Sequence, residues 1–230
     1  MVSYQPGHLE FQYSSRMVCR SIARGTLTLF SEHIQYIPRA EYDSNGKRQY
    51  NEWITSDGAW EMQVCKSAVH PSICGLTVLE ARLLQGATLL GTVLSLDKTG
   101  LTSMTGDHTA HLLLITLANI DSTIHSSSSS HALKLLTLIP VPKFIGVKRG
   151  LHGILENQLL HTCLDFVNAP LKLAAQNRAW MNDYTGYSHY CFTPLAAYIA
   201  DTPEAAALTG VAGKMSHLTT AMFREFGNPF

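Results

Sequence analysis

The sequence predicts an α/β fold built on one mixed sheet. Three apolar runs separated by short polar turns predict three consecutive strands, which pair as an antiparallel meander. A long segment with helical spacing follows them, and a fourth apolar run comes after it. A helical crossover implies that the fourth strand lies parallel to a strand already formed. We expect that partner to be the first strand.

The composition is that of one domain with a core of its own. The chain has 230 residues, of which 46% are apolar and 15% are charged. The chain has 17 basic and 17 acidic residues, so its formal net charge is zero. A free-standing DNA-binding domain usually has a basic excess, so this charge balance argues mildly against one. The sequence contains no P-loop, Gly-x-Ser-x-Gly or Gly-x-Gly-x-x-Gly motif, so NTPase, serine hydrolase and dinucleotide-binding functions lack support.

Cysteine usage and the apolar runs indicate an intracellular protein. The five cysteines are odd in number and irregularly spaced, which favours reduced thiols over a disulfide frame. The first residues lack the basic and apolar regions of a signal peptide. No apolar run approaches the roughly 18 residues that a transmembrane helix needs. We therefore expect no signal peptide and no membrane partner.

The N-terminal part predicts short elements without a clear pattern. Residues 32–38 alternate like a short strand, and Asn45-Gly46 marks a turn. Residues 53–63 predict a short helix broken at Gly58. We expect residues 1–63 to form an irregular N-terminal flanking segment.

The predicted core begins with the three meander strands. Residues 87–96 predict a buried first strand, which Asp97 closes before a turn-like stretch. Residues 111–120 predict the second strand. A serine run over 126–130 is typical of a turn tip. Residues 132–139 predict the third strand, because prolines follow directly.

The second half of the core predicts a helix, a strand and a further helix. Residues 151–168 carry apolar side chains at helical spacing, and Pro170 is expected to kink or restart the helix, which continues over 171–180. Residues 190–200 predict the fourth strand, which Asp201 closes. A short helix should follow, with a proline in its first turn.

Asp97 and Asp201 are the candidate functional residues, because each follows an apolar run. A carboxylate at the end of a buried strand lies at the sheet rim, where water and a cation can reach it. If the first and fourth strands are neighbours, both carboxylates lie at one rim. Magnesium takes one or two carboxylates plus waters and substrate phosphates, so the pair would suit phosphoryl transfer. Alternatively, each aspartate is only a turn former or a helix N-cap.

The predicted strand order is that of an RNase H-like core, and several segments resemble one family that has it. The similar segments are Gly86-Ala-Thr-Leu-Leu-Gly, Asp97-Lys-Thr, His111-Leu-Leu-Leu-Ile-Thr-Leu-Ala-Asn-Ile-Asp121, Leu138-Ile-Pro-Val-Pro-Lys-Phe144 and Tyr190-Cys-Phe-Thr-Pro-Leu-Ala-Ala-Tyr-Ile-Ala-Asp-Thr-Pro-Glu204. Together they resemble the Plavaka-type transposases, which fungal mobile elements encode and which look related to the CACTA group. The resemblance covers most of the chain, from about residue 32 to residue 230.

The resemblance implies an RNase H-like DDE nuclease core that cuts and joins DNA in the nucleus with Mg²⁺ or Mn²⁺. Its DNA partner would be the ends of the mobile element. Asp97 matches the aspartate of the family's Ser-Asp-Lys-Thr motif, although Leu96 stands in place of the serine. Asp201 matches the aspartate of the Ala-Asp-x-Pro-Glu motif. Both residues are expected to be catalytic and to bind the metal.

Two departures from the family pattern shape the functional expectation. The third acidic residue should come from a helix well downstream, and neither Glu204 nor Glu225 matches it. We therefore expect a partial or degenerate transposase with little or no cleavage activity. The alternative is a non-catalytic intracellular α/β remnant or interaction domain.

The second departure is an insertion. Relatives pass within a handful of residues from a Trp-Glu-Met-Gln-like segment to the first core strand, whereas residues 64–85 intervene here. This stretch has no clear period, so we expect a surface excursion, and we hypothesise that it is translated intron sequence. The predicted partial RNase H-like core then covers residues 86–230.

Overall fold

The computed structural model of the chain is a mixed α/β fold, as the sequence predicts. The residues that it describes are 30–64, 87–100, 109–142, 144–176, 179–182, 185–211, 215, 216, 218–220, 222 and 224. The predicted insertion, beyond its first residue Val64, lies outside these described residues, and so does Glu225.

Four strands form the central sheet. They are β4 (Thr92–Gly100), β5 (Thr109–Leu117), β6 (Lys134–Pro140) and β9 (Leu195–Ile199), in the order β6-β5-β4-β9. β5 pairs antiparallel with both β4 and β6, whereas β9 is parallel to β4. β4 is thus an inner strand with a partner on each side.

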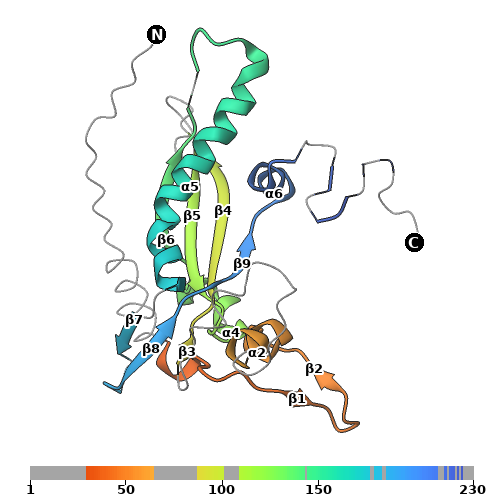
Figure 1. Ribbon diagram of the computed structural model, residues 1–230, viewed down its shortest axis with the longest axis vertical. Coiled ribbons are helices and arrows are strands. Elements are labelled where there is room, and N and C mark those ends of the chain that lie inside the picture. The colour runs from red at the N-terminus through yellow and green to blue at the C-terminus, as the bar shows by residue number, and fades with distance from the viewer. Residues whose placement is uncertain are drawn as a thin grey trace.

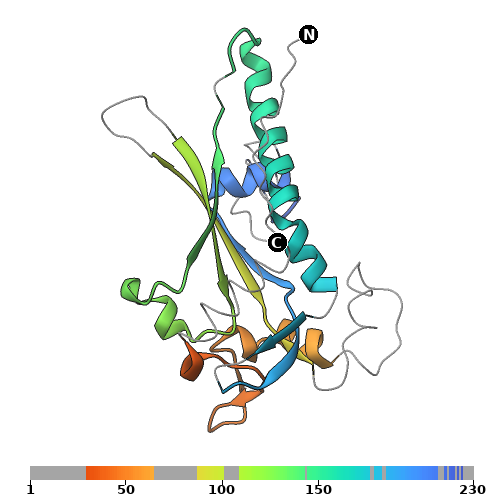
Figure 2. The same cartoon turned by 90° about the vertical axis from the view of Figure 1, so that its left-hand side faces the viewer.

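Helix α5 (His152–Gln176) connects β6 to the C-terminal strands and covers one face of the central sheet (Figure 1, Figure 2). Its buried residues include Leu160 and Leu164, which share the main core with Leu94, Leu96 and Leu113 of the sheet. Apolar residues at helical spacing on α5 therefore meet every second residue of β4 and β5, which is how a helix and a pleated sheet bury one face each.

The structure decides two details of this region. α5 is one continuous helix that contains Pro170, so of the two expected effects of this proline, a kink or a restart, the restart does not occur. Proline removes one backbone hydrogen bond, whose acceptor would be the carbonyl of Phe166, and Phe166 lies on the exposed side of the helix. The predicted helix over 171–180 also ends early, because Ala179–Asn182 forms strand β7.

Two of the predicted strands are each split between the central sheet and a second, smaller sheet. The smaller sheet has the order β3-β8-β7, with β3 at Thr88–Leu89 and β8 at Ser188–Phe192. The strand predicted over 87–96 is therefore β3 followed by β4, and the strand predicted over 190–200 is β8 followed by β9. Each prediction of a single strand is wrong, because the chain passes from one sheet to the other within it.

Gly91 and Pro194 lie where these two crossings occur. Pro194 has no N–H for a sheet ladder, but its carbonyl accepts from the Thr92 N–H at 2.8 Å and from the Thr92 hydroxyl at 2.9 Å. A Cβ on Gly91 would lie 2.6 Å from Cη2 of Trp53 and 2.9 Å from Cβ of Ala196. The two points where the chain passes from one sheet to the other thus lie in contact, and the Trp53 side chain packs against them.

The N-terminal segment contains several short elements. They are η2 (Ser31–His33), β1 (Glu41–Tyr42), β2 (Arg48–Gln49), η3 (Trp53–Thr55) and α2 (Asp57–Val64). The strand predicted over 32–38 is wrong, since a 3-10 turn and a single bridge between Ile34 and Ile120 occupy it. The predicted turn is the β1–β2 hairpin, in which Gly46 has a φ of 76°. The predicted helix over 53–63 divides at Ser56 rather than at Gly58.

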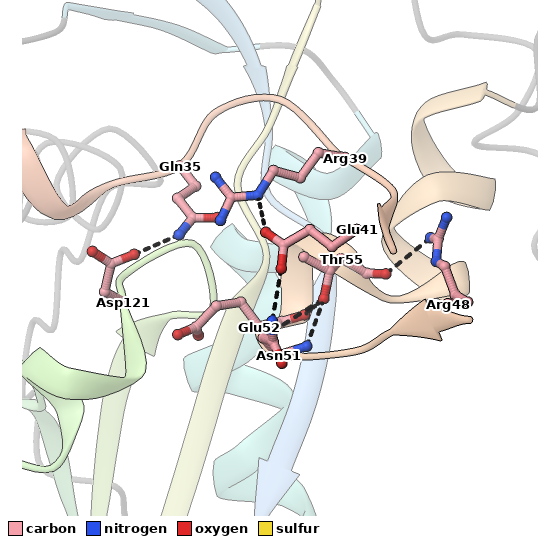
Figure 3. A network of polar contacts seen from close by, with 8 residues as sticks. All are labelled: Gln35, Arg39, Glu41, Arg48, Asn51, Glu52, Thr55 and Asp121. Carbon is pink, nitrogen blue, oxygen red and sulfur yellow. Dashed lines mark hydrogen bonds and ion pairs between the residues drawn. The ribbon is translucent and has the colours of Figure 1, made fainter. Parts of the chain in front are cut away.

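Polar contacts join this segment to the end of β5. Gln35 Nε2 donates to Asp121 Oδ1 at 2.6 Å, and the Glu52 carboxylate accepts from both the N–H and the hydroxyl of Ser122. Figure 3 shows Gln35 reaching Asp121 beside a network that links Glu52 to its neighbours in the segment. Ser122 opens the short helix α4 (Ser122–His125), so the N-terminal segment caps an element of the core.

Asn119 is the buried link between the same parts of the chain. Its Oδ1 accepts from the Gly91 N–H at 2.8 Å, and its Nδ2 donates to the carbonyls of Gln35 and Leu89 at 2.8 and 2.9 Å. Its side chain is almost fully buried. One side chain thus satisfies three backbone groups from two segments that are distant in the sequence.

The remaining described elements are short. They are η4 (Ser128–Ser130), η5 (Arg149–Leu151) and α6 (Thr202–Thr209). α6 directly follows β9, and a hydrogen bond between His161 Nε2 and the Ala207 carbonyl at 3.0 Å joins it to α5.

Candidate active site

The register of β4 and β9 brings Asp97 and Asp201 to the same level. The last described pair of these parallel strands is Ser95 opposite Ile199, and Asp97 and Asp201 are each two residues further on. β9 ends at Ile199, so Asp201 lies just beyond the strand. The predicted parallel pairing of the two strands is confirmed, and it sets Asp97, on β4, at the level of Asp201, just beyond the end of β9.

Asp97 does not close its strand, and that part of the prediction is wrong. β4 continues to Gly100, with Lys98 opposite His111 and Gly100 opposite Thr109 of β5. The β4–β5 ladder supplies the backbone partners of residues 97–100, so the pair extends as a ribbon beyond the end of β9. Asp97 is therefore an exposed residue within a strand, at the height where the parallel neighbour stops.

Alternation along β4 fixes the surroundings of Asp97. The Thr99 hydroxyl donates to Asp97 Oδ2 at 3.0 Å, as residues two apart on one face of a strand can. The adjacent Lys98 lies on the other face, where its Nζ is 3.4 Å from Glu156 Oε1 of α5. Asp97 thus presents its carboxylate on the face of β4 that α5 does not cover.

Asp201 is the N-cap residue of α6. Its Oδ1 accepts from the Glu204 N–H at 2.9 Å, and its backbone carbonyl accepts from the Ala205 N–H. The bond from the Glu204 amide lowers the pKa of the Asp201 carboxyl, so the group is negatively charged at neutral pH. Asp201 is thus a helix N-cap, as one of the alternatives had it, and its carboxyl also contacts the Glu204 carboxyl.

Sequence reasoning missed a buried pair beside Asp201. Glu204 of α6 is 6% exposed and His111 of β5 is 7% exposed, with 3.6 Å between Glu204 Oε1 and His111 Nδ1. Burial is the main cause that raises the pKa of Glu204 to about 6, and the Asp201 carboxylate is the second cause. Burial is the main cause that lowers the pKa of His111, and the positive charge of Lys98 is the second cause. In the sequence, Glu204 looks like an ordinary first-turn acid, and only the tertiary contacts distinguish it.

The donor set suits a hard divalent cation with few protein ligands. Within the described part of the chain, no group of three or more histidines, cysteines, aspartates and glutamates is arranged to hold a metal ion. The carboxylates of Asp97 and Asp201 are the oxygen ligands that Mg²⁺ and Mn²⁺ prefer, and these ions commonly keep several waters or substrate phosphates. The two residues present thus fit a metal that its substrate helps to hold.

Comparison with known proteins gives one match. No curated protein and no solved structure matches the chain with statistical significance. No helix among the described residues is long and apolar enough to cross a membrane. Residues 22–230 match the family described as Plavaka transposase, so the match covers most of the chain, including Asp97, Asp201 and the whole described structure. The chain belongs to the Plavaka transposase family.

Proposed function

We propose that the chain carries the first two carboxylates of a DDE-type active site, Asp97 and Asp201, in an RNase H-like core that acts on DNA. The observation that carries the proposal is the parallel β4–β9 register, which sets both residues at one level of neighbouring strands. The sheet order and the crossover helix α5 support the RNase H-like assignment. The family match supports DNA as the substrate.

The chemistry of the site supports a divalent metal as cofactor. Asp97 and Asp201 are both exposed, so water and a phosphodiester can approach them. A bound Mg²⁺ or Mn²⁺ would activate the attacking water or 3′-hydroxyl and stabilise the leaving oxygen. Asp201 is held in the charged form by the Glu204 amide, which favours cation binding. The Thr99 hydroxyl orients one oxygen of Asp97 and leaves the other for the cation.

The test is Mn²⁺ binding, followed by electron paramagnetic resonance, in the wild type and in Asp97→Asn and Asp201→Asn. Asparagine caps helices as well as aspartate does, so the second variant keeps the start of α6 while it removes the charge. Asp165→Asn on the exposed surface of α5 is the matched control, because it removes an exposed carboxylate that pairs with Lys172. We expect each site variant to lose at least tenfold in affinity and the control to bind like the wild type. Equal binding by all four proteins would refute the site.

Cleavage of DNA duplexes that carry the mobile-element ends tests the reaction itself. Neither Glu204 nor Glu225 matches the family's third acidic residue, so we expect little or no cleavage by these residues alone with Mg²⁺ or Mn²⁺. Strong nicking that disappears in Asp97→Asn would show that the catalytic set is complete. We also propose a nuclear location, which a fluorescent fusion of the chain would test.

A further inference from the structure

Glu204 is a buried acid at a position where helices usually carry an exposed one. It is the third residue of α6, and its side chain is 8% exposed. A first-turn acid normally faces water, where it interacts favourably with the positive end of the helix dipole. The cap is the bond from the Glu204 N–H to Asp201 Oδ1. The described contacts of the Glu204 carboxyl are with the Asp201 carboxyl, the Lys98 backbone and His111, and none of these is the return bond of a capping box. Capping therefore does not explain why the carboxyl group is buried.

The Glu204 carboxyl lies in a cluster of buried polar groups, beside the Asp201 carboxyl and the Lys98 backbone. His111 Nδ1 is 3.6 Å from Glu204 Oε1, and the His111 side chain is 9% exposed. The charge of Glu204 also contributes to the raised pKa of the Tyr198 hydroxyl, after burial. Within the described residues, Glu204 Oε2, His111 Nδ1 and the Tyr198 hydroxyl have no hydrogen-bond partner. Such atoms lower stability, so a cluster of them calls for an explanation in function.

The cluster lies directly beside the candidate active site. Glu204 comes from α6, Tyr198 from β9 and His111 from β5. His111 is opposite Lys98, the residue that follows Asp97 on β4. The Glu204 amide holds the Asp201 carboxylate, and the Glu204 side chain reaches the strand next to Asp97. The pair of Glu204 and His111 thus connects the start of α6 to the sheet at the level of both aspartates.

We propose that Glu204 and His111 are positioning residues that fix the Asp201 carboxylate beside Asp97. Glu204 acts on Asp201 through its backbone amide and through its carboxyl group, and His111 acts through the Glu204 side chain. Neither residue touches the cation. The role of the pair in cation binding rests on the proposed function of Asp201, whereas its role in holding Asp201 does not.

Loss of the pair should weaken cation binding without removing a ligand. Groups that orient metal ligands typically contribute 10–100-fold to metal affinity. His111→Ala removes the contact to Glu204 and leaves both aspartates and the α6 cap in place. His161→Ala is the matched control, because His161 also holds α6, but through the Ala207 carbonyl at its far end.

The first measurement is amide hydrogen exchange of the metal-free protein. The Glu204 amide donates to Asp201 Oδ1, so its exchange rate reports directly on how firmly that carboxylate is held. We expect at least tenfold faster exchange of this amide in His111→Ala and no change in His161→Ala. His111→Gln, which keeps an N–H able to donate to Glu204, should restore most of the protection and serves as the test if the alanine variant does not fold. Unchanged exchange of this amide in the folded variant would overturn the proposal.

The second measurement is Mn²⁺ affinity in His111→Ala, Glu204→Gln and the double variant. The effects of mutating residues that act as one unit do not add, so the double variant should lose no more Mn²⁺ affinity than the more affected single variant. A loss confined to Glu204→Gln, with His111→Ala binding like the wild type, would make Glu204 a direct ligand and overturn the positioning role. An equal loss in His161→Ala would indicate a general loosening of α6 and would also overturn it. If the wild type binds no Mn²⁺, the proposed function fails, while hydrogen exchange still decides whether the pair holds Asp201.

Discussion

Replacement of Asn119 by alanine should lower the free energy of unfolding by about 3–5 kcal/mol. The change removes three hydrogen bonds and leaves the Gly91 N–H and the carbonyls of Gln35 and Leu89 without that partner. Each net hydrogen bond contributes about 1 kcal/mol, and a buried group left unpaired costs about 1–3 kcal/mol, less where water enters. The expected loss is a large part of the roughly 5–15 kcal/mol that stabilises a typical domain.

Urea unfolding of the purified chain measures this loss, through a lower midpoint at an unchanged slope. Ser188→Ala is the control, because it removes one exposed hydrogen bond to Asn182 and should change stability by less than about 0.5 kcal/mol. Asn119→Asp tests the direction of the bonds. It keeps the acceptor for Gly91 but turns a carboxylate toward two carbonyls, so it should be no more stable than the alanine variant at neutral pH. A loss below about 1 kcal/mol in Asn119→Ala, or wild-type stability of Asn119→Asp, would refute the reasoning.

Three further predictions address packing, protonation and the insertion. Gly91→Ala should destabilise the fold by about 1–3 kcal/mol, because the added Cβ meets the Trp53 ring. Gly153→Ala lies within α5, where the added Cβ meets no other atom, and should stabilise the fold by about 0.5–1 kcal/mol. Thermal unfolding of both variants checks the contrast. Burial lowers the pKa of His111 below the 6.5 of a free histidine. The unfolded chain therefore binds a proton at this residue more strongly than the folded chain does. The stability that neutral His111 contributes is thus lost as the pH falls below 6.5. Urea midpoints of the wild type and His111→Gln between pH 5 and 8 should therefore converge toward low pH, and a constant difference would contradict this. Sequencing of transcripts should show spliced messages that lack the codons for residues 64–85; their presence in every message, together with unfolding on deletion, would make the segment a true structural element.

Much of the core could be predicted from the sequence because its signals are local. Apolar runs between polar turns predict β5 and β6, and helical spacing predicts α5, each to within a few residues. A crossover helix between strands predicts a parallel neighbour, and the observed parallel pairing of β4 with β9 follows this rule. The Plavaka resemblance selected the same two residues from matched motifs.

Other features follow from contacts that no local pattern encodes. The apolar runs over 87–96 and 190–200 each look continuous, yet each divides between two sheets, where Gly91 lies close to Ala196 and the Pro194 carbonyl accepts from Thr92. Asp97 lies within a strand rather than at its end, because β5 continues to pair with β4 after β9 has stopped.

By itself, the sequence determined the α/β class, the main core elements, the family and the two candidate carboxylates, since these depend on side-chain periodicity and on short motifs. Only the tertiary structure decided which polar residues are buried. In the sequence Asn119 is only a polar residue near the end of the predicted second strand, but in the structure Gln35, Leu89 and Gly91 converge on it. In the sequence Glu204 looks like a surface acid, but in the structure it is buried beside His111. The physical reason is that the cost of burying a polar group, and the partners that offset it, depend on chain segments far apart in the sequence.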